Sequence, residues 1–491
     1  MAWALVACAI RGVILACGLL PSGPAAAHGF GQRYDLPLPL WLYLGGAGLI
    51  VALSFLLLTL FVRAVPLSQP ARRINLLRYR IGRALASPTI LGICRLLVVG
   101  LYLLTIAAGL FGVQSPLKNI APAMVWAIWW VGMAYIAALI GDVWALVNPL
   151  DTLFAWAEAL YARLRAGRAL AIWLRPPVWL GVWPAVLLFA VFIWMELIWD
   201  DSDRPARLAT AMLLYSALTW LGMRLFGRAQ WLCRGDVFAI VFGLLARFAP
   251  TETRLDNRTV RAWNLRAYAV GLLVRETVDL STIALVILVL ASVSFDGFME
   301  TPAWASVIET IAGPAQDWRS ANPRLVGSIQ SLGLFVAPLL FLAVYLAVSR
   351  LIVWFGNASA HAGKPPAAYC ATLRVAGLFV LTLMPISIAY HLAHYLSFLM
   401  MAGQYLIPMA SDPFGVGWNL FGSGLYRIKV GIIDARIVWY VSLIAIVLGH
   451  VAAVYLAHVI ALQEFPDRRA ALRSQYPMLV LMVCYTMISL W

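Results

Sequence analysis

The chain has 491 residues, of which 63% are hydrophobic and 12% are charged, and its formal net charge is +15. A soluble domain has about 45–50% apolar residues, so water cannot be the solvent for most of this chain. The basic residues lie mostly in short loops between apolar segments, where they set the orientation of a membrane protein, so the charge indicates no nucleic-acid partner.

The first 27 residues have the pattern of a secretory signal peptide. Arg11 supplies a positive charge, residues 12–20 form an apolar run, and Ala25-Ala26-Ala27 offers small residues for cleavage. Cleavage after Ala27 gives a mature chain of residues 28–491 that begins at His28. An uncleaved signal anchor is the alternative.

Ten apolar segments beyond residue 27 predict membrane-spanning helices, each of which needs about 20 residues to cross the hydrocarbon core. In chain order they are residues 39–61, 91–112, 122–141, 178–199, 206–226, 268–292, 331–348, 371–400, 437–460 and 477–491. Residues 237–248 are apolar but too few to cross, so they predict an interfacial or buried helix. The sequence therefore predicts an all-α polytopic membrane protein in which residues 28–491 form a single helical transmembrane domain.

The loops predict the orientation of these helices. If each segment crosses once, the arginine-rich stretches share one side, which is the cytoplasm by the positive-inside rule. They are residues 63–83, 163–168, 224–266, 350–364 and 468–473. The periplasmic side receives the mature N-terminus and the acidic or mixed loops near residues 295–325 and 403–436. We expect a multi-pass protein of the bacterial inner (plasma) membrane, in contact with membrane lipid.

Histidines in the second half are the first candidates for chemistry, because ionisable groups in membrane helices are costly and often functional. His391 and His394 are three residues apart on one predicted helical face, which suits two ligands of one metal ion. His450 and His458 follow on the next span, about 12 Å apart, so His450 is the better third ligand. His28 could add an imidazole and an amine from the periplasmic side. We predict a divalent transition metal, copper or zinc, although hydrogen bonding between helices is the simpler alternative.

Acidic residues form the second group of candidates. Glu276 and Asp279 share one helical face, and Arg275 with Asp279 has the spacing of an internal ion pair. Glu196 precedes an acidic run by one turn and could be an ion or proton ligand, or an interfacial residue. Asp412 begins an Asp-Pro-Phe-Gly turn in the loop after the first histidine pair, where it could cap a periplasmic-facing site.

Several motifs are spread over nearly the whole mature chain. They are His28-Gly-Phe-Gly-Gln-Arg-Tyr-Asp35, Asn148-Pro149, Phe242-Gly-Leu-Leu-Ala-Arg-Phe248, Phe295-Asp-Gly-Phe298, Tyr390-His-Leu-Ala-His394, Ser411-Asp-Pro-Phe-Gly415 with Trp418, Gly449-His450, Ala457-His458, and Ser474-Gln475 with Pro477-Met478. In these motifs the chain resembles a family of bacterial polytopic membrane proteins named fenitrothion hydrolases. The resemblance implies hydrolysis of the P–O aryl bond of an organophosphorus triester, a hydrophobic small-molecule substrate.

Three functions use the same residues. A hydrolase would hold a metal at the three histidines to activate water, with Asp412 or His28 orienting or deprotonating the nucleophile. A copper-handling or transport protein, or a proton relay, would add Glu276 and Asp279 to the pathway. An electron-transfer or assembly subunit would bind haem through a histidine pair. One cluster of histidines favours hydrolysis and staggered positions favour translocation or electron transfer. The sequence leaves open whether a small partner subunit binds.

Overall fold

The computed structural model describes residues 39–62, 72–273, 278–313, 323–356, 368–429, 431–465 and 467–490. The predicted signal peptide, His28 and Glu276 lie outside these ranges. Nine of the described helices are long and apolar enough to cross a membrane, or ten if one bent pair counts as a span. The prediction of an all-α polytopic membrane protein is therefore confirmed.

The nine candidate spans lie on or near predicted segments. Five of them are single helices: α2 (Leu40–Phe61), α4 (Pro88–Phe111), α10 (Pro205–Phe226), α13 (Leu280–Met299) and α20 (Ala435–Glu464). Two more are Val178–Leu197, which includes α9 (Trp183–Leu197), and Arg324–Gly356, which lies on α16 (Pro323–Gly356). The other two are composite: Ile120–Leu139 contains α5 (Ile120–Pro122), the π-helical Ala123–Gly132 and α6 (Met133–Leu139), and Cys370–Ser411 contains α17 (Ala368–Phe379), α18 (Met384–Ala402) and α19 (Leu406–Ser411). The tenth predicted segment lies on helix α21 (Arg468–Leu490), which is not among the nine.

Shorter elements complete the described chain. The helices are α3 (Arg80–Leu85), α7 (Val143–Val147), α8 (Pro149–Leu164), α11 (Arg228–Arg234), α12 (Val237–Ala246) and α14 (Pro302–Ala312). The strands β1 (Ile74–Asn75), β2 (Thr251–Asp256) and β3 (Thr259–Leu265) form an antiparallel sheet in the order β1-β3-β2. Helices α11 and α12 are bent by 66° and form the pair that could count as a tenth span.

One span begins later than its sequence predicts. The apolar pattern places it at residues 268–292, whereas α13 begins at Leu280 and extends to Met299. Asp279 is the N-cap, and its carboxylate accepts a hydrogen bond from the backbone N–H of Thr282 at 3.0 Å. Within the predicted segment, Val270–Leu272 form a 3-10 helix, and Arg266 just before the segment donates to the carbonyls of Ala246 and Ala249. Asp279 is therefore a capping residue at the end of the span.

The described residues fall into two compact units. Unit 1 comprises residues 1–70, 272–394 and 434–491, and unit 2 comprises residues 71–271 and 395–433, including in each case the parts outside the described ranges. The boundary between His394 and Tyr395 falls inside α18, so this helix contributes residues to both units.

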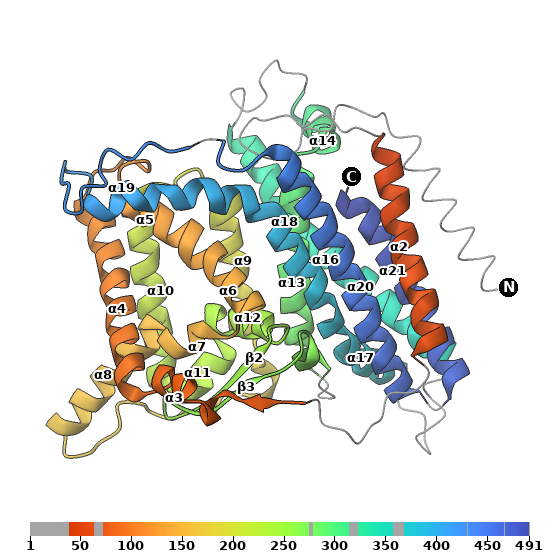
Figure 1. The fold of residues 1–491 in the computed structure, drawn as a ribbon, viewed down its shortest axis with the longest axis horizontal. Helices are drawn as coiled ribbons and strands as arrows, with labels where there is room; N and C mark the ends of the chain where they lie inside the picture. Colours follow the sequence, from red (N-terminus) through yellow and green to blue (C-terminus); the bar gives the residue numbers. More distant parts are fainter. Residues whose placement is uncertain are drawn as a thin grey trace. The chain divides into compact units, whose positions relative to one another are not determined.

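Unit 1 is a bundle in which α21 packs against α2, α16 and α20, and α13 packs against α16 and α17 (Figure 1). Of the apolar stretch of α13, 56% is buried, compared with 11% for α16. Helix α13 is therefore interior, whereas α16 presents its leucines outward, where lipid is the natural solvent for apolar side chains. Polar residues on α13 consequently face other helices of unit 1.

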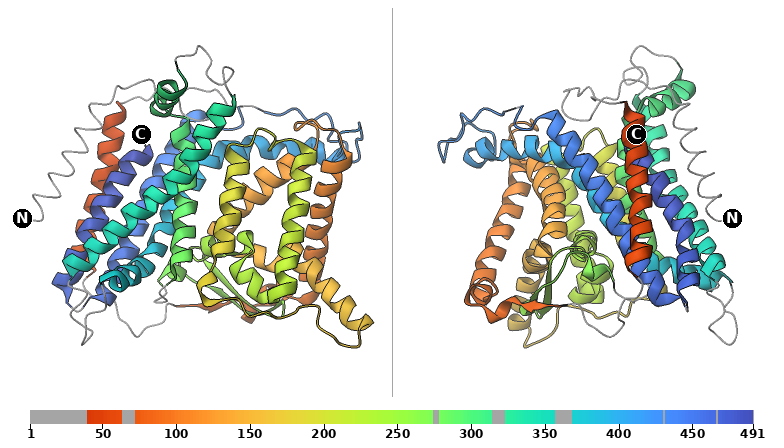
Figure 2. Two further views of the ribbon diagram at one scale, coloured as in Figure 1. Left: turned by 180° about the vertical axis from the view of Figure 1, so that it is seen from behind. Right: turned by 45° about the vertical axis from the view of Figure 1, so that its right-hand side comes forward.

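Unit 2 contains α3–α12 and the small sheet (Figure 2). Its core is aromatic. Trp129 stacks on Trp144 with ring centroids 5.4 Å apart, and Phe238 contacts Trp129 at 5.3 Å and Phe192 at 5.1 Å. Aromatic rings bury large areas and stabilise one another in stacked and edge-to-face pairs. This core packs α6, α7 and α9 around the buried helix α12.

Replacing Asp279 with alanine should destabilise the protein by about 1 kcal/mol, because the first turn of α13 loses its capping acceptor. Asp279→Asn, which keeps a side-chain oxygen, should retain most of this stability. Burial raises the pKa of Asp279, but hydrogen bonds from Ser281 and Thr282 outweigh burial and hold it below its ordinary value.

The sign of this pKa shift fixes the pH dependence. A carboxylate with a lowered folded-state pKa stabilises the fold above its unfolded pKa, and that stability is lost as pH falls through the folded pKa. Thermal unfolding in detergent should therefore separate wild type from Asp279→Ala at pH 7, and the two should converge in acid. Equal melting temperatures at pH 7 would contradict the capping role.

Candidate functional site

An imidazole and a carboxylate meet inside unit 1. The Nε2 atom of His394 on α18 lies 2.6 Å from the Oδ2 atom of Asp296 in the last turn of α13. Their side chains are 18% and 16% exposed. A carboxylate that accepts from one ring nitrogen fixes the tautomer and orientation of the ring, which leaves Nδ1 as the basic atom when the ring is neutral. His394 and Asp296 therefore form an oriented acid–base pair, the His394–Asp296 pair.

A cluster of hydroxyls lies beside this pair on α13, α18 and α21. Ser294, two residues before Asp296 on α13, hydrogen-bonds the hydroxyl of Tyr485 on α21. Tyr390, one turn before His394 on α18, stacks on Tyr485 with ring centroids 6.2 Å apart. At about 1.5 Å of rise per residue, the cluster is displaced from the pair by roughly 3–6 Å along the helix axes. We call Ser294, Tyr390 and Tyr485 the tyrosine cluster.

His450 on α20 borders the tyrosine cluster. Its ring centroid lies 5.7 Å from that of Tyr485, and its side chain is fully buried. The Nδ1–H donates to the carbonyl of Ile446 at 2.8 Å, since a carbonyl can only accept. The Nε2 atom has no hydrogen-bond partner among the described residues. His450 therefore presents a ring nitrogen that can accept a proton.

The residue before His450 explains how α20 approaches α18. A Cβ atom at Gly449 would lie 2.5 Å from the Cβ of Ala389 and 2.7 Å from the carbonyl oxygen of Pro385, closer than real contacts allow. Only glycine fits, as is common where membrane helices touch backbone to backbone. Gly449 thus sets the distance between the two histidine-bearing helices.

His458 occupies a separate position further along α20. Its Nδ1 lies 2.8 Å from Oε1 of Gln475, and its Nε2 lies 3.0 Å from the carbonyl oxygen of Val62, the residue that ends α2. The amide of Gln475 is oriented by its own donation to Ala471 at 2.7 Å. A neutral ring can donate to one of these acceptors and a cationic ring to both.

The three histidines of the predicted metal site lie on two packed helices of unit 1, α18 and α20. Among the described residues, no group of three or more His, Cys, Asp and Glu side chains is arranged to hold a metal ion. His391 is buried on α18 one turn from His394, but His394 contacts Asp296 through Nε2, and His450 contacts Ile446 through Nδ1. Each of these contacts involves one ring nitrogen, as is also usual for histidines that bind a metal through the other nitrogen, so copper or zinc at His391, His394 and His450 stays a prediction.

The two remaining candidates lie in unit 2 and are held in local structure. The carboxylate of Asp412 accepts from the backbone N–H groups of Val416 at 3.0 Å and Gly417 at 2.6 Å, which closes the turn after α19. Glu196 on α9 accepts from the hydroxyl of Tyr395 at 2.9 Å. A catalytic role for Asp412 stays a prediction, since its hydrogen bonds explain its presence as a turn residue.

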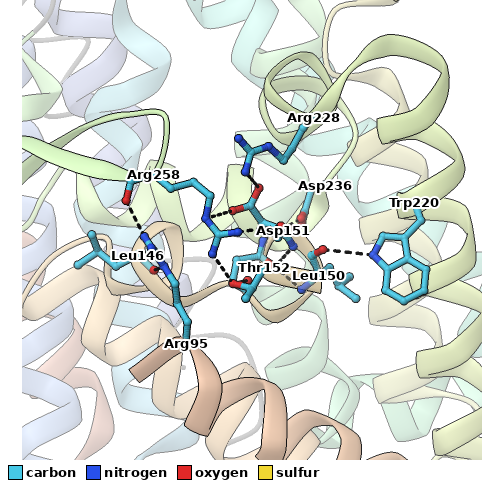
Figure 3. A network of polar contacts seen from close by, with 10 residues as sticks. Arg95, Leu146, Leu150, Asp151, Thr152, Trp220, Arg228, Asp236 and Arg258 are labelled. Carbon is cyan, nitrogen blue, oxygen red and sulfur yellow. Dashed lines mark hydrogen bonds and ion pairs between the residues drawn. The ribbon is translucent and has the colours of Figure 1, made fainter. Parts of the chain in front are cut away.

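Unit 2 also contains a network of charged side chains around Asp151 (Figure 3). Asp151, in the first turn of α8, lies 3.3 Å from Arg228 and 3.5 Å from Arg258. Arg258 also donates to Thr152, and its carbonyl accepts from Arg95 on α4. Arg258 has a positive φ of 67°, which costs on the order of 1 kcal/mol in a non-glycine residue. The network fastens the β2–β3 hairpin to α4 and α8, and these contacts offset the strain.

Sequence reasoning missed Asp296, Ser294, Tyr390 and Tyr485. Two of these residues could have been found from the sequence. Asp296 is a carboxylate at the end of an apolar segment, and Tyr390 precedes His391 in the motif Tyr390-His-Leu-Ala-His394. Ser294 and Tyr485 could not, because an isolated hydroxyl in a span usually bonds its own helix backbone.

Comparisons with known proteins place no constraint on function. No family model, curated protein or solved structure matches the chain. The resemblance to fenitrothion hydrolases therefore stays a prediction, and function has to be inferred from the side chains of unit 1.

Removing one partner of the Asp151 network should be costly. Asp151→Asn leaves arginines in a largely buried place without their counter-ion, and we expect a loss of about 3 kcal/mol of unfolding free energy. Combining it with Arg258→Gln should cost less than the sum of the single changes, as measured in a double-mutant cycle by thermal unfolding. Arg261→Gln on the same hairpin is the control, because its ion pair with Asp256 is 71% and 53% exposed and should contribute little. Additive losses would contradict the coupling.

Gly449→Ala should destabilise unit 1 by about 1–3 kcal/mol, because the added methyl group forces α20 away from α18. Gly100→Ala on α4, where nothing lies within 4 Å of the added Cβ, is the matched control and should be neutral or stabilising. Melting temperatures in the same detergent measure both. An unaltered melting temperature for Gly449→Ala would show that the two helices are not in the close contact described.

Proposed function

We propose that unit 1 transfers protons within the membrane, with the His394–Asp296 pair as the acid–base entry group. The observation that carries the proposal is the 2.6 Å contact between the two side chains. Ionisable residues inside membrane helices most often pair with one another and belong to substrate or proton pathways. A buried Asp–His pair can hold one proton between two groups and exchange it without leaving an isolated charge.

The tyrosine cluster supports a second step next to the pair. Hydroxyl groups both donate and accept hydrogen bonds, so they can relay a proton without a lasting charge. The Ser294–Tyr485 hydrogen bond joins α13 to α21, and the ring of His450 lies against Tyr485. The Nε2 atom of His450, which has no hydrogen-bond partner among the described residues, is an acceptor in the ring that borders this cluster. The His394–Asp296 pair, the tyrosine cluster and the imidazole of His450 thus form a series of proton-exchanging groups on four packed helices.

His458 supports a third position nearer the other end of unit 1. It adjoins Val62 at the end of α2, while Asp296 adjoins the end of α13 that leads to α14 (Figure 1). The eight residues from His450 to His458 correspond to about 12 Å along α20, so a proton needs water to pass between them. Staggered histidines are the arrangement expected of translocation rather than of one hydrolytic centre.

Hydrolysis of an organophosphorus triester is the second candidate, and the same pair favours it. An imidazole oriented by a carboxylate is the base that activates a nucleophile in many hydrolases. Water would form the new P–O bond and give its proton to Nδ1 of His394. The aryl oxide would leave with the electrons of the broken P–O bond and receive a proton afterwards. Such a reaction needs no metal at the described histidines.

Proton flux into proteoliposomes, measured with an enclosed pH-sensitive dye under an imposed potassium potential, tests the first proposal. Asp296→Asn and His394→Gln should each lower the flux on the order of tenfold or more, because a positioned acid–base group contributes at least that much. Tyr485→Phe should lower it through loss of the relay hydroxyl.

Tyr345→Phe is the matched control, since Tyr345 is buried in the same unit but donates to the carbonyl of Ala376 on α17. It should leave the flux unchanged. No flux in the wild type, or equal flux in Asp296→Asn and Tyr345→Phe, would overturn the proposal. If the same vesicles show no proton flux but hydrolyse fenitrothion, and His394→Gln abolishes that hydrolysis, the result would favour the hydrolase instead.

A further inference from the structure

Unit 2 has an apolar groove between α8 and α10 that the proposed function does not use. Its volume is about 280 Å³, and its lining includes Leu153 and Phe154 of α8, Leu170 of the following segment, and Trp220, Leu221 and Arg224 of α10. Arg224 is the one charged side chain in this lining, and it lies in the last turn of α10. The groove therefore combines an apolar interior with a cation at one end.

The walls of the groove are fixed. The indole N–H of Trp220 donates to the carbonyl of Leu150 at 3.2 Å, as Figure 3 shows. Phe154 belongs to a buried cluster with Met223 and Trp231, and Leu170 packs against that cluster. These contacts hold the walls in place, and a preformed apolar groove can accept a chain of methylene groups at low cost in ordering.

The segment that follows α8 is strongly basic and is held beside Arg224. Residues 159–195 contain no acidic residue, and the exposed arginines of the segment are Arg163, Arg165, Arg168 and Arg175. The backbone N–H groups of Ile172 and Leu174 donate to the carbonyls of Arg224 and Leu225 at 2.7 and 2.8 Å. These bonds satisfy the last carbonyls of α10 and bring the basic segment to the charged end of the groove.

Apolar side chains around the groove are exposed in a pattern that suits the membrane interface. Trp156, Leu160 and Leu164 lie on the outer part of α8, and Trp173 and Trp179 lie on the segment that follows. Tryptophan together with arginine is typical of helices at the level of the lipid headgroups. Figure 1 shows α8 extending beyond the neighbouring helices of its unit.

We propose that this groove binds an anionic phospholipid. One acyl chain occupies the space between Leu153, Phe154 and Leu221, and the phosphate group lies at Arg224 within reach of the basic segment. Charge complementarity selects the ligand, because clustered arginines beside a membrane attract anionic headgroups. The predicted orientation places the site in the cytoplasmic leaflet. This proposal is independent of proton transfer in unit 1.

Native mass spectrometry of the full-length detergent-purified protein tests it by titration with phosphatidylglycerol and phosphatidylethanolamine of identical acyl chains. The wild type should bind phosphatidylglycerol on the order of tenfold more tightly. Arg224→Gln should remove most of this preference, and Leu221→Trp, which fills the groove, should weaken both lipids. Arg350→Gln, an exposed arginine on α16 of unit 1, is the matched control and should change neither.

Three outcomes would overturn the proposal. Equal affinities of the wild type for the two lipids would show that charge does not select the ligand. Identical behaviour of Arg224→Gln and Arg350→Gln would show that the headgroup lies elsewhere. Full displacement of phosphatidylglycerol by inorganic phosphate would identify a free-anion site in which the apolar groove has no part.

Discussion

The absence of water from the hydrocarbon core is the constraint on which unit 1 depends. A polar side chain there must find its partner within the protein, since lipid offers none. Asp296 meets His394, Ser294 meets Tyr485, and both ring nitrogens of His458 face oxygen acceptors. These contacts join α13 to α18 and to α21, and α20 to α2 and α21. The polar groups that suggest chemistry are therefore also what specifies how the helices are arranged.

Unit 2 meets the same constraint in a different way. Its buried charges lie near helix ends, where Asp151 pairs with Arg228 and Arg258. The β2–β3 hairpin supplies Arg258. The interior between α6, α7, α9 and α12 is filled with aromatic rings, which need few polar partners. Charge that is neutralised in a network stabilises the fold, whereas the arginines of the basic segment beside α10 are exposed.

The pairing of His394 changes the chemistry that the histidines suggest. An imidazole whose Nε2 contacts a carboxylate is oriented for proton exchange through its other ring nitrogen. His450 is constrained in the same way by Ile446, and His458 by Gln475 and Val62. His394, His450 and His458 thus have separate local partners, and this separation is the basis for proposing stations along a proton path.

The sequence by itself determined the membrane class, the position of nearly every span and the presence of histidines within them, because length and apolar composition are local properties of a segment. It misplaced the start of α13, since a single cap at Asp279 outweighs the apolar residues before it. It could not find the partner of His394 or the turn bonds of Asp412, and it gave no reason for glycine at position 449. The partner of His394 and the need for glycine depend on which helix faces come together, and the bonds of Asp412 on how its turn closes. Only the packed structure decides such contacts.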